Sequence, residues 1–204
     1  MEKKGIVLLF GAFNPFTNAH LMIGRLAAEA FPEHRICYVP ARLAYFKNWK
    51  GSEENDVLAE DLRYDLISGS IEGLDRFTVT DIELKGIVNG RTYNTVAYFR
   101  EVLGYTDIVL CMGTDKMAEL ETWFMGRELI AENRFLIITR DGNSVDDCLT
   151  EYDRQHRESF LELKNTELAD LSATRIREAA ERGDLEFVKA NVPPYVFSRL
   201  YKTE

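Results

Sequence analysis

The sequence lacks the features that mark secreted and membrane proteins. Its three cysteines, Cys37, Cys111 and Cys148, are odd in number and lie far apart, which argues against a disulfide framework or a zinc site. Cys37 and Cys111 fall inside apolar runs, so we expect buried, reduced thiols. No stretch approaches the roughly 18 apolar residues of a membrane helix, and the apolar run of about six residues near the N-terminus is too short for a signal peptide. We therefore expect a cytoplasmic protein with no membrane partner.

Positive charge is also scarce. The chain has 25 lysines and arginines against 34 aspartates and glutamates, a formal net charge of −9 at pH 7. Such an acidic chain is a poor general binder of nucleic acid, so any basic site for a phosphate ligand must be local. With 204 residues, 46% of them apolar and 29% charged, the composition predicts one globular domain over residues 1–204. Nothing marks a large apolar surface, so the oligomeric state stays open.

Several familiar catalytic motifs are absent as well. There is no Gly-x-x-x-x-Gly-Lys-Ser/Thr loop, no Gly-x-Gly-x-x-Gly after the first strand and no Gly-x-Ser-x-Gly elbow, which disfavours P-loop enzymes, dehydrogenases and serine hydrolases. The histidines His20, His34 and His156 are scattered, and no cluster of metal ligands accompanies them. We expect no metal held by the protein alone.

Short apolar runs alternate with helical patterns along the whole chain. The runs expected as strands are residues 5–10, 35–39, 77–82, 107–112, 134–139 and 160–163. The segments expected as helices are about 20–31, 55–71, 92–103, 115–121, 123–132, 144–158, 174–182 and 194–201. This alternation predicts an α/β fold, a doubly wound parallel sheet with a short C-terminal helical part. In such sheets, ligands bind beyond the C-terminal strand ends where the strand order reverses.

The loop from Gly11 to His20 is the first candidate site. It joins a strand to a helix, and loops of this kind bring backbone N–H groups and a helix N-terminus toward one point, which suits a phosphate. Thr17 is an ordinary N-cap in the plainest interpretation, and a lone histidine such as His20 is often structural. Together, their hydroxyl and imidazole groups can also donate to one phosphate. A second loop, at Gly113, faces the same crevice if the two strands are neighbours.

The segment from Ser172 to Arg177 is the second candidate. Hydroxyls at a helix start and an arginine in its first turn can hold a polyphosphate, although a capped surface helix explains them too. The helix dipole disfavours a cation in the first turn, and an anionic ligand would relieve that conflict.

Other residues allow two interpretations each. Trp123, expected at a helix start, suits either the core or stacking on a flat heterocycle. Asp115 could accept hydrogen bonds from ribose hydroxyls or cap the helix that follows. Lys47 could contact a phosphate or lie in a solvated loop, and Thr92 is expected to cap the helix of 92–103.

Both candidate segments resemble motifs of the nucleotidyltransferase superfamily. Residues 11–20, GAFNPFTNAH, resemble its signature Gly-x-Phe-(Asp/Asn)-Pro-x-(His/Thr)-x-Gly-His, and residues 172–177, SATRIR, resemble its distal Ser-Ser/Thr-Thr-x-Ile-Arg motif. Between and beyond them, five segments resemble bacterial nicotinate-nucleotide adenylyltransferases: Gly113–Asp115, Glu121–Trp123, the strand from Arg134 to Arg140, Arg91–Thr95 and the tail around Val192–Val196. The resemblance covers almost the whole chain.

The resemblance implies a Rossmann-like nucleotidyltransferase fold and adenylyl transfer from ATP to nicotinate or nicotinamide mononucleotide, with Mg²⁺ arriving with ATP. It implies catalytic roles for His20, Thr17 and Arg177. It also implies a set of ATP contacts: Gly11, Ala12, Phe13, Asn14, Lys47, Gly113, Asp115, Arg140, Ser172 and Thr174. The implied pyridine contacts are Thr92, Tyr93, Asn94 and Trp123.

The chain departs from the closest pattern at four positions. Thr17 stands where this subfamily usually has histidine, Ala19 replaces a glycine, Ala173 replaces a hydroxyl residue, and Asn94 replaces a threonine. Related phosphopantetheine adenylyltransferases carry threonine at the position of Thr17. Two alternatives therefore stay open: adenylyl transfer to another phosphate such as phosphopantetheine, and nucleotide binding without catalysis. The choice between acid and amide substrate, and closure of loop 41–55 over ATP, are also open.

Overall fold

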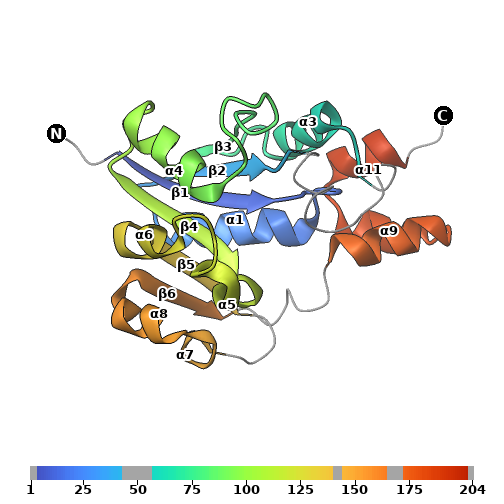
Figure 1. Ribbon diagram of the computed structural model, residues 1–204. Helices are drawn as coiled ribbons and strands as arrows, with labels where there is room; N and C mark the ends of the chain where they lie inside the picture. The colour runs from blue at the N-terminus through green and yellow to red at the C-terminus, as the bar shows by residue number, and fades with distance from the viewer. Residues whose placement is uncertain (1–3, 43–56, 140–143, 165–171, 202–204) are drawn as a thin grey trace.

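A single parallel sheet organises the protein. The computed structural model describes residues 4–42, 57–139, 144–164 and 172–201 (Figure 1). Six described strands pair in the order β3-β2-β1-β4-β5-β6, and every pair is parallel. Their bounds are β1 Gly5–Gly11, β2 Arg35–Pro40, β3 Phe77–Val79, β4 Asp107–Gly113, β5 Arg134–Thr139 and β6 Phe160–Lys164. The predicted doubly wound fold is confirmed.

Helices cover both faces of this sheet. One face carries α1 (Asn18–Ala30), α3 (Glu60–Ser70), α9 (Ala173–Glu181), α10 (Leu185–Asn191) and α11 (Pro194–Leu200). The other carries α4 (Thr92–Glu101), α5 (Met117–Leu120), α6 (Gly126–Glu132), α7 (Val145–Cys148) and α8 (Glu151–Gln155), with 3₁₀ turns at Thr114–Lys116 and Arg157–Ser159. Among the described residues, no helix is long and apolar enough to cross a membrane.

The central strand β1 shows why the sheet is covered twice. Val7 and Leu9 pack into the core under α1 and α3, whereas Ile6 and Leu8 pack into the core under α4 and α6. Successive side chains of a strand point to opposite faces, so a continuous apolar run needs cover on both. All three cysteines are free, and Cys37 and Cys111 are buried in strands as expected.

Several expected elements differ from the structure, and one helix was not expected. The strand expected over 77–82 ends at Val79, because the chain then turns, with Lys85 N–H donating to the Asp81 carbonyl. The helix expected from 55 begins at Glu60, within the part that the structure describes. The segment 144–158 divides into two short helices, each started by its own capping box at Ser144 and Thr150. Helix α10 was missed altogether.

The expectation that Thr92 caps α4 was wrong. Arg91 occupies the cap position with extended backbone angles, and Thr92 is already helical. A cap must have non-helical angles so that its side chain can reach back to the first turn. Trp123 was also misplaced, since it lies in a turn and α6 begins three residues later at Gly126.

Candidate active site

The two predicted glycine loops meet where the strand order reverses. β1 pairs directly with β4, and from these strands the sheet extends toward β2 on one side and β5 on the other. A cavity of about 190 Å³ opens beside their C-terminal ends. Its lining includes five of the predicted site residues: Gly11, Phe13, His20, Gly113 and Asp115. A larger hollow of about 470 Å³ lies away from these loops, between α3, β3 and Tyr195.

The ring of His20 is held by the loop that precedes it. Its plane is stacked on Phe16, with ring centroids 5.6 Å apart, and meets the edge of Phe13 at 5.0 Å. Both phenylalanines are buried, and both also pack edge-on to the buried ring of Tyr38. The Tyr38 hydroxyl donates to the His20 carbonyl at 3.0 Å. Burial raises the pKa of this hydroxyl far above its ordinary value, so it stays a donor.

Hydrogen bonds with Thr17 decide which ring nitrogen of His20 carries the proton. The backbone N–H of Thr17 donates to Nδ1 at 3.0 Å, and the His20 N–H donates to the Thr17 hydroxyl at 3.4 Å, which forms a reciprocal capping box at the start of α1. An atom that accepts from a backbone N–H cannot be protonated, so the neutral imidazole keeps its proton on Nε2. The ring is thereby set as a donor at Nε2. Thr17 is 1% exposed, and its hydroxyl lies 3.0 Å from the same Nδ1.

The carbonyl groups of the loop are tied to three different parts of the chain. The Gly11 carbonyl accepts from the Ala41 N–H at 2.9 Å, the Ala12 carbonyl from Arg63 Nη1 at 2.8 Å, and the Asn14 carbonyl from Arg177 Nη1 at 2.7 Å. In a trans peptide the carbonyl and the following N–H point in opposite directions. The N–H groups of Ala12 and Phe13 therefore point away from Ala41 and Arg63, which makes them available on the other side of the loop.

The distal motif lies next to this loop. Ser172 caps α9 by accepting from the Arg175 N–H at 3.2 Å, and the first turn of α9 has no acidic residue. The Arg177 guanidinium spans from the Asn14 carbonyl to the Thr174 hydroxyl, which accepts at 3.3 Å. Ser172 and Thr174 are exposed. The structure thus brings residues 14 and 177 into direct contact, as a shared phosphate site requires.

The predicted pyridine contacts lie on the other face of the sheet. Thr92, Tyr93 and Asn94 form the first turn of α4, and the half-buried rings of Tyr93 and Trp123 pack on the core of that face. The Asn94 side chain donates to Asn89 at 2.9 Å. None of these residues lines the cavity beside His20.

Asp115 and Gly113 line the same cavity as His20. A Cβ atom at residue 113 would lie 2.5 Å from Asp115 Oδ1, so glycine leaves room for that carboxylate beside the end of β4. Asp115 is exposed and caps neither of the turns that follow. Lys47, Arg140 and most of loop 41–55 lie outside the described residues. Among the described residues, no group of three or more His, Cys, Asp or Glu side chains could hold a metal.

Arg63 and Glu83 are among the buried polar residues that escaped the sequence analysis. Arg63 is completely buried on α3, where a charge on the apolar face of Leu62, Leu66 and Ile67 was the available signal. Glu83 is 3% exposed and accepts from the Thr95 hydroxyl at 2.7 Å, and Thr95 is the last residue of the Arg91–Thr95 segment. Burial raises the pKa of Glu83 to about 7, against the opposing effect of the Thr95 hydrogen bond.

The model of the cytidylyltransferase-like family matches residues 8–179. The chain belongs to the cytidylyltransferase-like family. The match includes both the loop with His20 and the distal motif with Arg177, and it confirms the predicted membership. The roles of individual site residues stay predictions.

Named relatives of this cytidylyltransferase-like chain include a probable nicotinate-nucleotide adenylyltransferase from Clostridium tetani, 26% identical over 99% of this chain and 98% of the relative. A second probable nicotinate-nucleotide adenylyltransferase, from Clostridium novyi, is 28% identical over 87% of this chain and 86% of the relative. The Plasmodium falciparum nicotinic acid mononucleotide adenylyltransferase has the same fold. Its complexes with APC and with NaAD both superpose with a TM-score of 0.73 at 18% identity, covering 97% of this chain and 96% and 97% of theirs.

Proposed function

We propose that this protein transfers the adenylyl group of ATP to nicotinate mononucleotide or nicotinamide mononucleotide, giving the dinucleotide and pyrophosphate. The observation that carries the proposal is the position of His20, fixed as an Nε2 donor in the cavity between the loops of Gly11 and Gly113. Relatives that bear the nicotinate-nucleotide name match 87% to 99% of the chain and support this acceptor. The proposal treats residues 1–204 as one cytoplasmic nucleotidyltransferase domain.

The chemistry needs no protein nucleophile. A 5′-phosphate oxygen of the mononucleotide attacks the α-phosphorus of ATP, the bond from that phosphorus to the bridging oxygen breaks, and pyrophosphate leaves with the bond electrons. The protein contributes positioning and stabilisation of the negative charge that spreads over the phosphate oxygens. His20 Nε2–H donates to an α-phosphate oxygen, and the N–H groups of Ala12 and Phe13 face the same group.

The remaining roles are assigned to the distal motif, the Gly113 loop and the segments that resemble the pyridine contacts. The start of α9, with Ser172, Thr174 and Arg177, holds the β and γ phosphates, where a helix N-terminus and a guanidinium both favour negative charge. Gly113 and Asp115 approach the adenosine ribose. The Thr92–Asn94 turn and Trp123 hold the pyridine. Lys47 and Arg140 are further predicted ATP contacts. The substrate is the Mg²⁺ complex of ATP, because triphosphate oxygens bind this ion themselves.

A pyrophosphate-release assay with ATP and a panel of acceptors tests the proposal. We expect release with nicotinate or nicotinamide mononucleotide, and the ratio of the two kcat/KM values gives the acid or amide preference. Release only with phosphopantetheine would instead support the alternative that Thr17 suggests. ATP binding by calorimetry without release for any acceptor would identify a nucleotide-binding protein that has lost catalysis, and either result overturns the proposal.

A further inference from the structure

Arg63 is a charged side chain buried directly behind the candidate phosphate loop. It is 0% exposed and is among the largest fully buried side chains of the described residues. Its Nη1 donates to the Ala12 carbonyl at 2.8 Å, and its Nε donates to the Leu58 carbonyl at 3.1 Å. Charged residues are rarely buried completely, because removing them from water is costly. Such a position therefore calls for a physical reason.

The segment that carries Arg63 holds the loop at a second point. The Leu58 N–H donates to Asn14 Oδ1 at 3.0 Å, and Asn14 is itself 6% exposed. Arg63 therefore connects this segment to the loop, because it donates to the Leu58 carbonyl and to the Ala12 carbonyl at once. A planar guanidinium suits this role because its donors leave in fixed directions.

The hydrogen bond from Arg63 acts on the orientation of the loop. It fixes the Ala12–Phe13 peptide so that its N–H points away from Arg63. A donor that is already oriented needs no rearrangement when negative charge develops on a bound phosphate. Burial lowers the pKa of Arg63 and the charge of Glu60 raises it, but a guanidinium stays protonated at neutral pH.

We propose that Arg63 is a positioning residue for the triphosphate, which orients the Phe13 N–H toward the α-phosphate. This inference rests on the proposed function. Arg63 does not touch the substrate and acts through the backbone of Ala12 and Phe13. The anionic group it serves is the α-phosphate of ATP, where negative charge increases during the transfer.

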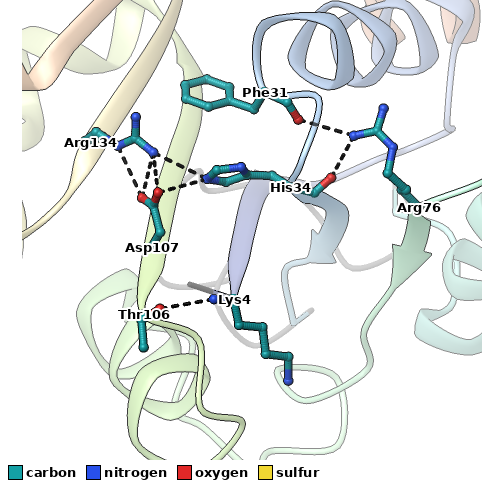
Figure 2. A network of polar contacts seen from close by, with 7 residues as sticks. All are labelled: Lys4, Phe31, His34, Arg76, Thr106, Asp107 and Arg134. Carbon is teal, nitrogen blue, oxygen red and sulfur yellow. Dashed lines mark hydrogen bonds and ion pairs between the residues drawn. The ribbon is translucent and has the colours of Figure 1, made fainter. Parts of the chain in front are cut away.

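A second arginine, at the opposite ends of the strands, provides a matched control. Arg76 Nη1 donates to the carbonyls of Phe31 at 3.2 Å and His34 at 2.9 Å, and its Nη2 donates to that of Ala28 at 3.3 Å. Figure 2 shows two of these bonds. Arg76 thus ties backbone carbonyls together as Arg63 does, but at the N-terminal ends of the strands, far from the phosphate loop.

The test compares Arg63→Met, Arg63→Lys and Arg76→Met in steady-state kinetics, ATP calorimetry and thermal unfolding. We expect Arg63→Met to lower kcat about 30-fold and weaken ATP binding about tenfold, since the orientation of the loop donor is lost. Arg63→Lys keeps one donor for the Ala12 carbonyl and recovers a part of both. Arg76→Met lowers the unfolding temperature and leaves kcat and ATP affinity within about twofold, because only packing and local hydrogen bonds change.

The inference is overturned if Arg63→Met unfolds earlier but keeps the wild-type kcat and ATP affinity, or if Arg76→Met loses both equally. Should Arg63→Met fail to fold, Arg63→Lys decides, since unchanged kinetics in that variant contradict a role that needs two directed donors. A wild-type protein that shows no turnover with any acceptor contradicts the proposed function instead. The ATP affinities still judge Arg63 in that case.

Discussion

Histidine and arginine side chains lie at both ends of the parallel strands, but their contacts differ between the N-terminal and the C-terminal end. At the N-terminal edge, His34 Nε2 lies 3.3 Å from Asp107, and Arg134 donates to both carboxylate oxygens of Asp107 at 2.6 and 2.7 Å (Figure 2). At the C-terminal edge, Arg63 and Arg177 donate to neutral carbonyls, and His20 accepts from a backbone N–H. The first set pairs opposite charges with one another, whereas the second directs its donors at the carbonyl groups of one loop and sets His20 beside a cavity. A cluster of polar groups therefore indicates a site when its hydrogen bonds orient a loop and a donor beside a cavity.

Carboxylates extend the same contrast. Burial raises the pKa of Asp107, but hydrogen bonds and charge from Arg134 and His34 outweigh it, so the net shift is downward. Glu83 follows β3 at the other edge and has only the Thr95 hydroxyl to oppose its burial, so its pKa rises to about 7. The direction of each shift follows from the balance between burial and the hydrogen bonds and charges that oppose it.

The largest expected difference between the edges is between the two histidines. We expect His20→Ala to lower kcat about 100-fold or more while the fold remains intact, because an oriented transition-state donor is removed. We expect His34→Ala to leave kcat unchanged and to reduce the free energy of unfolding by about 1 kcal/mol, as for the loss of a partly buried polar contact. Pyrophosphate release and urea unfolding measure the pair. Near-normal turnover in His20→Ala would contradict the assigned role.

The two carboxylates should respond oppositely to pH. The folded protein binds a proton on Glu83 more tightly than the unfolded chain does, so this group destabilises the fold as pH rises from about 4.5 to about 7. Glu83→Gln is neutral and still accepts from Thr95. It should be more stable than wild type at pH 8, by about 1 to 3 kcal/mol, and equal to it at pH 4.

Asp107→Asn is the matched variant for the other sign. The lowered pKa of Asp107 contributes stability above its unfolded value, near 4, which is lost as the pH falls through the folded value. Asp107→Asn should therefore be less stable than wild type at pH 7, by about 0.5–1 kcal/mol for a partly exposed pair, and equal to it in strong acid. Urea unfolding across pH 3–8 measures both variants. If the stability difference from wild type changed with pH in the same direction for both variants, the proposed contrast between the two carboxylates would be wrong.

The smallest expected effect concerns Thr17. Thr17→Val removes the hydroxyl of the capping box but keeps the backbone N–H that donates to His20. We expect a loss of about 1 kcal/mol in stability and a kcat lowered about five- to tenfold, because the ring is less well held. Thr17→Ser should restore both. Thr150→Val removes the equivalent cap of α8 and should cost similar stability with no change in kcat.

Equal kinetics for Thr17→Val and Thr150→Val, measured at a temperature where both are folded, would reduce Thr17 to a helix cap. A larger loss for Thr17→Ser than for Thr17→Val would contradict the role of the hydroxyl. Either result sharpens what distinguishes α1 from an ordinary capped helix.

The strands, both loops and the helix of the distal motif could be predicted because their signals are local. Apolar runs such as residues 6–9 and 107–112 identify buried strands, and the order of segments then places Gly11 beside Gly113. Arg63 and Glu83 could not be assigned, because their hydrogen-bond partners are not local in sequence. Ala12 lies 51 residues from Arg63, and Thr95 lies 12 residues from Glu83, beyond a turn. Helix α10 was missed because it is short and follows Gly183 and the cap Asp184 within a largely polar stretch. Thr92 was misjudged because a cap depends on backbone angles that composition does not reveal.

The pairing of β1 with β4 has a consequence for synthesis of the chain. β1 ends at residue 11 and its neighbour β4 begins at residue 107, so about 96 residues separate them. At about 5 to 20 residues per second, a ribosome needs roughly 5 to 20 seconds to deliver β4. During that interval one long side of β1, with its four buried residues Ile6 to Leu9, has no partner strand. Unpaired apolar strand edges can pair with other chains. The strand β1, which leads into the candidate phosphate loop, is therefore open to aggregation until β4 has been made.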